Sequence, residues 1–116
     1  MSLRTLQLFA LVRSLSRTAC ACAAFCVCCS EQVAYQLKCG VNDKVCSGMI
    51  ALTKVQATKV FDLCARESTQ ILGGAACVRG GPGEKVERLY REVRVNAIAG
   101  GSEEVLMDLS MRMAKL

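Results

Sequence analysis

Two short motifs combine glycines with amide or hydroxyl side chains, a pattern that suits contact with a nucleotide. In Gln70-Ile71-Leu72-Gly73-Gly74, the glycines would let backbone N–H groups approach a phosphate, and Gln70 would add a side-chain hydrogen bond. In Gly100-Gly101-Ser102-Glu103-Glu104, Ser102 and the first N–H groups of a helix could meet a cofactor. Each motif also has a purely structural interpretation, as a glycine C-cap and a serine N-cap.

The surrounding residues limit what these motifs could bind. Glu103 and Glu104 disfavour a bare phosphate beside Ser102 and leave room for hydrogen bonds to ribityl or adenine groups. Neither motif follows a predicted strand, and no G-x-G-x-x-G occurs, which excludes a Rossmann turn. The stretch Gly83-Glu84-Lys85 lacks the Gly-Lys-Ser/Thr ending of a P-loop.

The chain has nine cysteines and no histidine. Cys₂His₂ zinc sites and Ser-His-Asp catalysis are therefore excluded. An odd count, with five cysteines between Cys20 and Cys29, is a poor disulfide framework. We expect a reducing compartment, no metal site, and cysteines that act as small buried hydrophobic residues, with packing favoured over redox chemistry for Cys26 and Cys29. A cysteine-rich metal or redox helix is the competing interpretation.

The composition predicts one all-α domain over residues 1–116. The chain is 53% hydrophobic and 22% charged, and has one proline and few aromatic residues, which disfavours a β-sandwich or barrel. Its net charge is +5, but no basic cluster interleaved with aromatic residues accompanies this charge. Binding to nucleic acid is therefore not expected.

The first thirty residues contain no Asp or Glu and carry Arg4, Arg13 and Arg17, which suits either a mitochondrial targeting segment or the first helix of a bundle. Alternating steps of four and three predict a packed helix seam. Its residues are Leu8, Val12, Leu15, Ala19, Cys22, Cys26, Cys29 and Val33. The uninterrupted apolar run Ala19–Cys29 is shorter than the ~20 residues that a bilayer requires, so we expect no membrane span. Because this run is apolar on all sides, we expect it to be buried on all sides.

Three further helices follow. Turn residues at 39–43 precede a long second helix over 47–72, and a glycine-rich loop over 73–83 precedes a third helix over 84–98. Glu84–Arg88 and Glu87–Arg91 are spaced for ion pairs on this third helix. Ser102 caps a short last helix with acidic residues in its first turn. We predict an up-down four-helix bundle of two long helices followed by two short ones.

Taken in order, the motifs resemble the C-terminal helical domain of acyl-CoA dehydrogenases. The family forms Q-x-x-G-G, E-R-x-Y-R-D and I-Y-E-G-T-S-E-I correspond to 70–74, 87–92 and 98–104. The clear resemblance covers 47–113, and Lys54 stands where the family commonly has lysine.

The resemblance implies a flavoenzyme that binds FAD at subunit interfaces. In this family the reaction is α,β-desaturation of an acyl-CoA thioester, with hydride transferred to flavin. Gln70, Gly73 and Gly74 would touch the adenosine diphosphate part of a neighbouring subunit's FAD, and Ser102 and Glu104 would touch the chain's own FAD. The implied partners are acyl-CoA, electron-transfer flavoprotein or oxygen as acceptor, and further copies of the chain or a companion dehydrogenase subunit.

One departure from the family pattern concerns the catalytic base. In this sequence the usual base position is occupied by Gly100, and glycine has no side chain that could accept a proton. The chain resembles in this respect the family branches that have a small residue at the same position. The family's N-terminal helical and β-barrel domains have no counterpart in the sequence. We therefore expect the C-terminal portion of a dehydrogenase, incomplete as a catalyst alone and with an exposed apolar face. The alternative is a non-enzymatic helical interaction module derived from that fold.

The sequence contains two possible targeting signals for intracellular compartments. Ala114-Lys115-Leu116 is close to the Ser-Lys-Leu peroxisomal signal. The arginine-containing, acid-free first thirty residues point instead to the mitochondrial matrix. Both compartments remain open at this point.

Overall fold

The computed structural model describes the backbone of residues 3–41 and 43–114, and the side-chain surroundings of residues 17–41 and 46–114. Within these ranges the chain forms helices α1 (Leu3–Lys38), α2 (Asp43–Leu72), α3 (Glu84–Ile98) and α4 (Glu103–Ala114), with a 3₁₀ helix η1 (Gly73–Cys77) and no strand. This confirms the predicted all-α class of two long helices followed by two short ones. The second helix begins at Asp43 rather than at residue 47.

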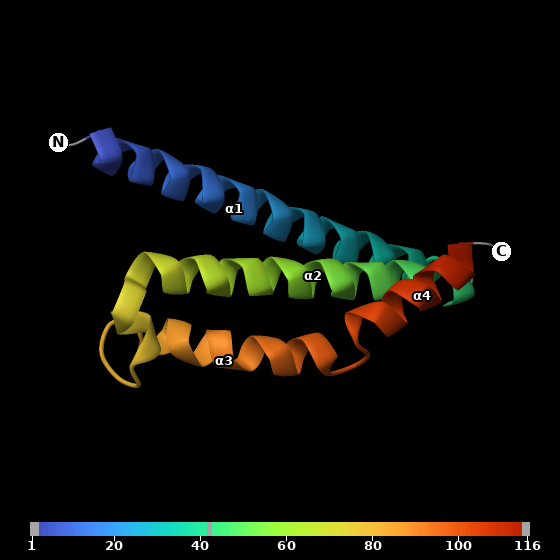
Figure 1. Ribbon diagram of the computed structural model, residues 1–116. Helices are drawn as coiled ribbons and strands as arrows, with labels where there is room; N and C mark the ends of the chain where they lie inside the picture. Colours follow the sequence, from blue (N-terminus) through green and yellow to red (C-terminus); the bar gives the residue numbers. More distant parts are fainter. Residues whose placement is uncertain (1–2, 42, 115–116) are drawn as a thin grey trace.

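Helix α2 is the centre of the structure, because α1, α3 and α4 all pack on it. Figure 1 shows α1 and α2 as antiparallel neighbours, with α1 diverging from α2 toward its N-terminal end. After η1 and a loop, α3 runs back along the other side of α2, and α4 continues toward the beginning of α2 (Figure 1). The molecule is elongated, with extents of 56 × 29 × 23 Å.

The predicted seam of α1 is confirmed over the part with described side chains. Residues on this face are less exposed than their neighbours: Ala19, Cys22, Cys26, Cys29 and Val33. The predicted seam positions Leu8, Val12 and Leu15 lie outside the described side chains. The buried core is made of small side chains, which lets the helices approach closely. Its apolar members are Val33, Cys46, Ala51, Val55, Ala65, Ala76, Val93 and Ala97.

The expected burial of α1 on all sides is wrong. Phe25 and Val27 are 62% and 56% exposed, and Cys20 and Cys28 are exposed as well. The physical reason is that α1 has one main neighbour, α2, so only one stripe of its apolar surface is covered. The expectation of buried cysteines holds for Cys46 alone among the nine free thiols.

One described helical segment, Arg17–Lys38, is long and apolar enough to cross a bilayer by length and composition. Only 6% of its most apolar window is buried. This test is weak evidence, because signal sequences and the core helices of soluble proteins pass it too. The expected absence of a membrane span stays a prediction, supported by the short uninterrupted run and by Glu31 within the segment.

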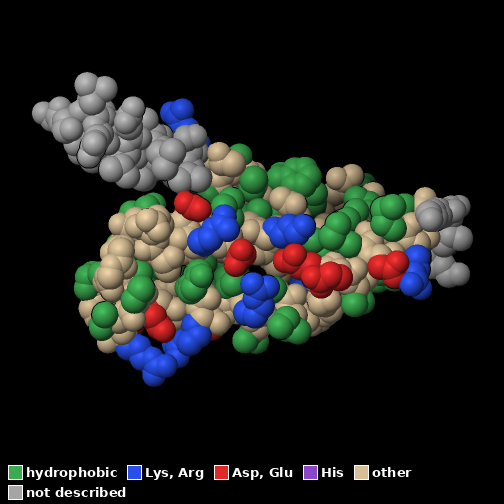
Figure 2. Space-filling view, viewed as in Figure 1, with side chains coloured by type: hydrophobic (Ala, Val, Ile, Leu, Met, Phe, Trp, Pro, Cys, Tyr) green, Lys and Arg blue, Asp and Glu red, His purple; other side chains and the backbone are tan. Residues whose placement is uncertain are grey.

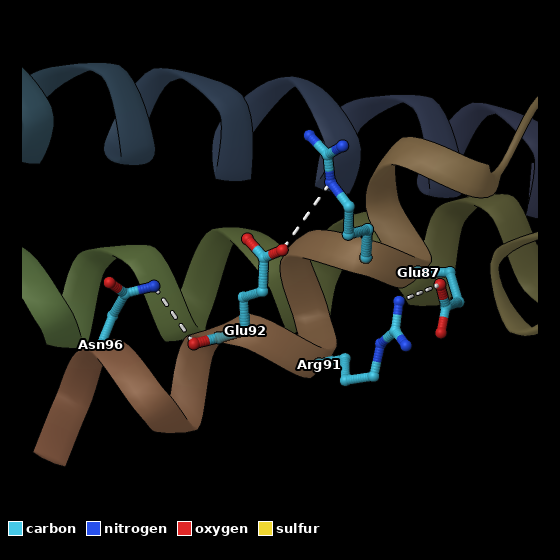
Figure 3. A network of polar contacts seen from close by, with 5 residues as sticks. Glu87, Arg91, Glu92 and Asn96 are labelled. Carbon is cyan, nitrogen blue, oxygen red and sulfur yellow. Dashed lines mark hydrogen bonds and ion pairs between the residues drawn. The ribbon is translucent and has the colours of Figure 1, made fainter. Parts of the chain in front are cut away.

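Ion pairs on α3 follow the predicted spacing with one difference (Figure 3). Arg91 pairs with Glu87 at 3.3 Å, as expected. Arg88 pairs with Glu92 at 3.8 Å instead of with Glu84. Glu92 also accepts a hydrogen bond at its carbonyl from the Asn96 amide, 3.1 Å away. These exposed pairs each contribute little to stability, about 0.3–0.5 kcal/mol.

Candidate functional site

The first candidate motif lies where α2 ends. Helix α2 stops at Leu72, and Gly73 has a φ of +57°, the left-handed conformation that a glycine C-cap provides. Gln70, Gly73 and Gly74 are all exposed. A Cβ placed on either glycine would meet nothing within 4 Å. The backbone here is therefore open to close approach by a ligand.

The second candidate motif forms the turn between α3 and α4. Gly100 and Gly101 adopt φ values of +74° and +114°. The Ser102 carbonyl accepts the first bond of α4 from the Leu106 N–H at 3.0 Å, which confirms Ser102 as the N-cap. Ser102 is half-buried and Glu104 is exposed.

The electrostatics of this turn keep Glu104 ionised. A hydrogen bond from its own backbone N–H lowers the pKa of Glu104, and the Ser102 hydroxyl lowers it further. Arg94 and Lys59 contribute in the same direction. The Glu104 carboxylate is therefore an acceptor, which suits hydroxyl and amine groups of a ligand and not a phosphate.

Two residues of α2 that lie beside this turn were not among the predicted site residues. The Lys54 ammonium donates to the carbonyls of Ala97 and Gly101, each at 2.8 Å. The Thr58 hydroxyl oxygen lies 3.4 Å from Oε1 of Glu103. The family resemblance marked Lys54 as a typical position, but its carbonyl partners are more than forty residues away along the chain.

The two motifs sit at different places along α2. Lys54 reaches the second motif, whereas Gln70 lies sixteen residues further along the same helix. At 1.5 Å per residue this corresponds to about 24 Å. The two motifs are therefore separate spots on the chain, and their contacts with two different cofactor molecules stay a prediction. The first motif offers an exposed amide and open backbone, and the second offers the exposed Glu104 beside the half-buried Ser102, with Gly101 packed against the Leu106 side chain. These polar groups fit the polar parts of FAD.

The position of the family's usual catalytic base carries no side chain in this sequence. Gly100 occupies the usual base position, and its left-handed φ of +74° explains why a glycine suits this turn. No group of three or more potential ligand side chains gathers in the described part of the chain. Burial, reinforced by Cys29 and Cys22, raises the pKa of Cys26, so the Cys26 thiol favours its protonated form.

The family model and the curated relatives that match this chain all point to the same protein family. The family model described as acyl-CoA dehydrogenase, C-terminal domain, matches residues 6–115. Acyl-CoA dehydrogenase AFT10-1 of Alternaria alternata is 48% identical over 75 residues, which are 65% of this chain and 17% of that protein. Acyl-CoA dehydrogenase apdG of Emericella nidulans is 38% identical over 88 residues, 71% of this chain and 19% of that protein. No solved structure matches.

The matched region explains both the helical fold and the order of the motifs. The chain spans less than a fifth of the length of the curated relatives it matches. The family match covers α1 from residue 6 onward, as well as the region over 47–113 that carries the motifs. By its sequence and its four helices, the chain belongs to the acyl-CoA dehydrogenase family, as the C-terminal domain.

Proposed function

We propose that this chain is the C-terminal helical part of a FAD-dependent acyl-CoA dehydrogenase and is incomplete as a catalyst alone. The observation that carries the proposal is that both family motifs lie at helix ends, with Gly73 left-handed and Ser102 at the N-cap of α4. The reaction would be α,β-desaturation of an acyl-CoA thioester. FAD would supply the hydride acceptor.

The residues of this chain would bind and orient the cofactor. Gln70 would donate its side-chain amide, and the exposed backbone at Gly73 and Gly74 would lie against the adenosine diphosphate part of a neighbouring subunit's FAD. Ser102 and the ionised Glu104 would hydrogen-bond polar groups of the chain's own FAD. The base that removes the α-proton would come from outside this chain, because Gly100 carries no side chain to accept it.

A flavin titration tests the proposal. FAD fluorescence would be followed as the purified chain is added, alone and together with a full-length acyl-CoA dehydrogenase subunit. Gly74→Val and Ser102→Ala should each weaken binding by roughly tenfold, because each removes one close approach or hydrogen bond to the cofactor. Glu92→Gln, on the exposed face of α3, is the matched control and should bind as the unaltered chain does. Unchanged affinity in both site variants would overturn the cofactor assignment.

A second candidate function is a non-enzymatic helical interaction module. Gly100 at the base position and the exposed apolar side chains of α1 favour it. Such a module would bind a dehydrogenase subunit in sedimentation experiments whether or not FAD is present. It would also leave acyl-CoA turnover by that subunit independent of Ser102. Strict FAD dependence of the association would favour the enzyme portion instead.

The proposed partners and compartment follow from the family and from the sequence signals. Acyl-CoA would be the substrate of the assembled enzyme, with electron-transfer flavoprotein or oxygen as acceptor and further copies or a companion subunit in the assembly. Lys115 and Leu116 of the peroxisome-like ending lie outside the described residues. Fluorescent fusions at either end distinguish the addresses: a C-terminal tag should abolish peroxisomal import, and an N-terminal tag should abolish import into the mitochondrial matrix.

A further inference from the structure

A single lysine fastens the turn that carries Ser102 and Glu104. The Lys54 ammonium donates to the carbonyls of Ala97 and Gly101, each at 2.8 Å. It therefore bridges the end of α3 and the turn that precedes α4. The last carbonyls of a helix lack partners within the helix and carry partial negative charge. The partly buried Lys54 ammonium supplies a donor and the opposite charge to the Ala97 carbonyl in the last turn of α3. It supplies a second donor to the Gly101 carbonyl in the turn that follows.

The intrinsic conformational preferences of its residues do not by themselves fix the backbone of the α3–α4 turn. Gly100 and Gly101 both adopt left-handed conformations, and glycine has the largest range of alternative conformations to choose from. The local bonds are Ala99 N–H to Val95 O and Gly101 N–H to Ile98 O. These bonds close the end of α3, but they do not anchor it to α2. The hydrogen bonds that anchor the turn to α2 come from Lys54, together with the approach of Thr58 to Glu103 one turn further along α2, and they add to the packing of α3 and α4 on this helix.

We propose that Lys54 is a positioning residue, which fixes the α3–α4 turn on α2 and thereby sets where Ser102 and Glu104 present their side chains to the flavin nucleotide. The proposal rests on the function proposed above. Lys54 acts through two backbone carbonyls, and its ammonium group does not itself need to reach the cofactor. Its stem also lines the apolar groove between α1 and α2, beside Val33 and Leu37.

The first test measures the turn without cofactor. Lys54→Met keeps the apolar stem and removes the donors, and Lys85→Met, at the other end of α3, is the matched control. Amide hydrogen exchange of Gly101 and Leu106 should become roughly tenfold faster in Lys54→Met, because hydrogen bonds from a charged donor are lost. Exchange in α1 should not change, and Lys85→Met should match the unaltered chain.

A conservative variant separates this role from general stability. Lys54→Arg keeps the charge and offers two donors, so exchange at Gly101 and Leu106 should return to within roughly threefold of the unaltered chain. If Lys54→Met does not fold, the comparison of Lys54→Gln with Lys54→Arg decides the question. Faster exchange spread evenly over all helices, or no change at the turn, would overturn the proposal.

The second test adds FAD and is read by flavin fluorescence. The affinity for FAD should fall roughly tenfold in Lys54→Met and recover in Lys54→Arg, since the turn then presents Ser102 and Glu104 correctly. A loosened turn with unchanged FAD affinity would overturn the positioning role. If the unaltered chain binds no FAD with or without a dehydrogenase subunit, the proposed function fails. The exchange data then still decide whether Lys54 fastens the turn.

Discussion

Among the cysteines of α1, Cys26 has a distinct chemical environment. It lies on the seam toward α2, and burial, followed by Cys29 and Cys22, raises the pKa of its thiol. The thiolate is the reactive form, so iodoacetamide should modify Cys26 severalfold more slowly at pH 8 than the exposed Cys20 and Cys28. Peptide mass spectrometry after timed quenching measures the three rates. Equal rates would mean that the seam does not shield Cys26.

Glu104 should make the chain sensitive to acid. Its pKa is lowered first by its own backbone N–H and next by the Ser102 hydroxyl, so folding is stabilised by the ionised form. That stabilisation is present above the usual glutamate pKa of about 4.3 and is lost as pH falls through the lowered folded-state value. Thermal unfolding between pH 7 and pH 3 should show a smaller acid-induced loss for Glu104→Gln than for the unaltered chain.

The same hydrogen bond provides a direct control. Ser102→Ala should raise the Glu104 pKa toward its usual range, as followed by the carboxyl carbon resonance in an NMR titration. An Asp108→Asn variant removes a carboxylate from the exposed side of α4, where it pairs with Arg112, and should leave that resonance unchanged. A Glu104 titration that does not respond to Ser102→Ala would contradict the assigned cause.

At the level of single residues, the sequence predicts helix caps, which depend on neighbouring residues. It does not predict hydrogen bonds between residues that are far apart along the chain. The C-cap at Gly73 and the N-cap at Ser102 depend on neighbours within a few positions, and the structure confirms both. Lys54 was recognised as a family position, but its hydrogen bonds to Ala97 and Gly101 depend on how α3 returns along α2. Nothing in the local pattern around Lys54 specifies that pairing.

At the level of elements, the turn between α3 and α4 depends on backbone conformation. Gly100 has a φ of +74°, which side chains with a Cβ rarely adopt. Gly100→Ala should therefore lower the free energy of unfolding by about 1 kcal/mol. Urea denaturation followed by circular dichroism measures the change.

Gly74→Ala is the matched control for that substitution. An added Cβ at Gly74 meets nothing within 4 Å, and Gly74 is not among the glycines with positive φ. Its effect on the free energy of unfolding should stay within about 0.5 kcal/mol, as for other surface substitutions. Equal losses in the two variants would show that the cost at Gly100 does not come from its left-handed backbone.

The sequence predicts the positions of the helices well, because the signals that start and end a helix are local. It predicts the burial of each helix face less well, because burial depends on which other helices pack against that face. The third helix begins at Glu84 and ends at Ile98 as the spacing indicated. The second begins at Asp43, four residues before the predicted start, within the segment read as a turn. Helix α1 follows its predicted seam, yet its outer face is exposed, because an all-apolar pattern says what a helix can bury and not how many neighbours it has.

At the scale of the whole molecule, apolar surface lies on both sides of the contact between α1 and α2. Phe25, Cys26, Met49 and Leu52 are among the residues that line a cavity of about 280 Å³ on one side. A second groove, of about 420 Å³, lies beside Val33 on the same pair of helices. Figure 2 shows hydrophobic side chains gathered along the described part of α1 and around the ends of the bundle. These apolar surfaces are uncovered in the described part of the chain.

The isolated chain should therefore associate with itself as its concentration rises. Phe25 and Leu52 are 62% and 51% exposed, and burying such side chains contributes about 1.5–3 kcal/mol each when complete. Sedimentation velocity over a hundredfold concentration range should show species larger than a monomer. The double variant Phe25→Gln with Leu52→Gln should weaken this association by roughly tenfold or more.

A control on another helix makes this prediction specific to the α1–α2 surface. Val105 on α4 is 63% exposed, so Val105→Gln removes a comparable apolar side chain away from the two grooves and should leave the association unchanged. A full-length acyl-CoA dehydrogenase subunit should also compete with self-association, since it would cover the same apolar side chains. A chain that stays monomeric at every concentration would contradict the prediction. It would mean that the exposed face of α1 needs no covering partner.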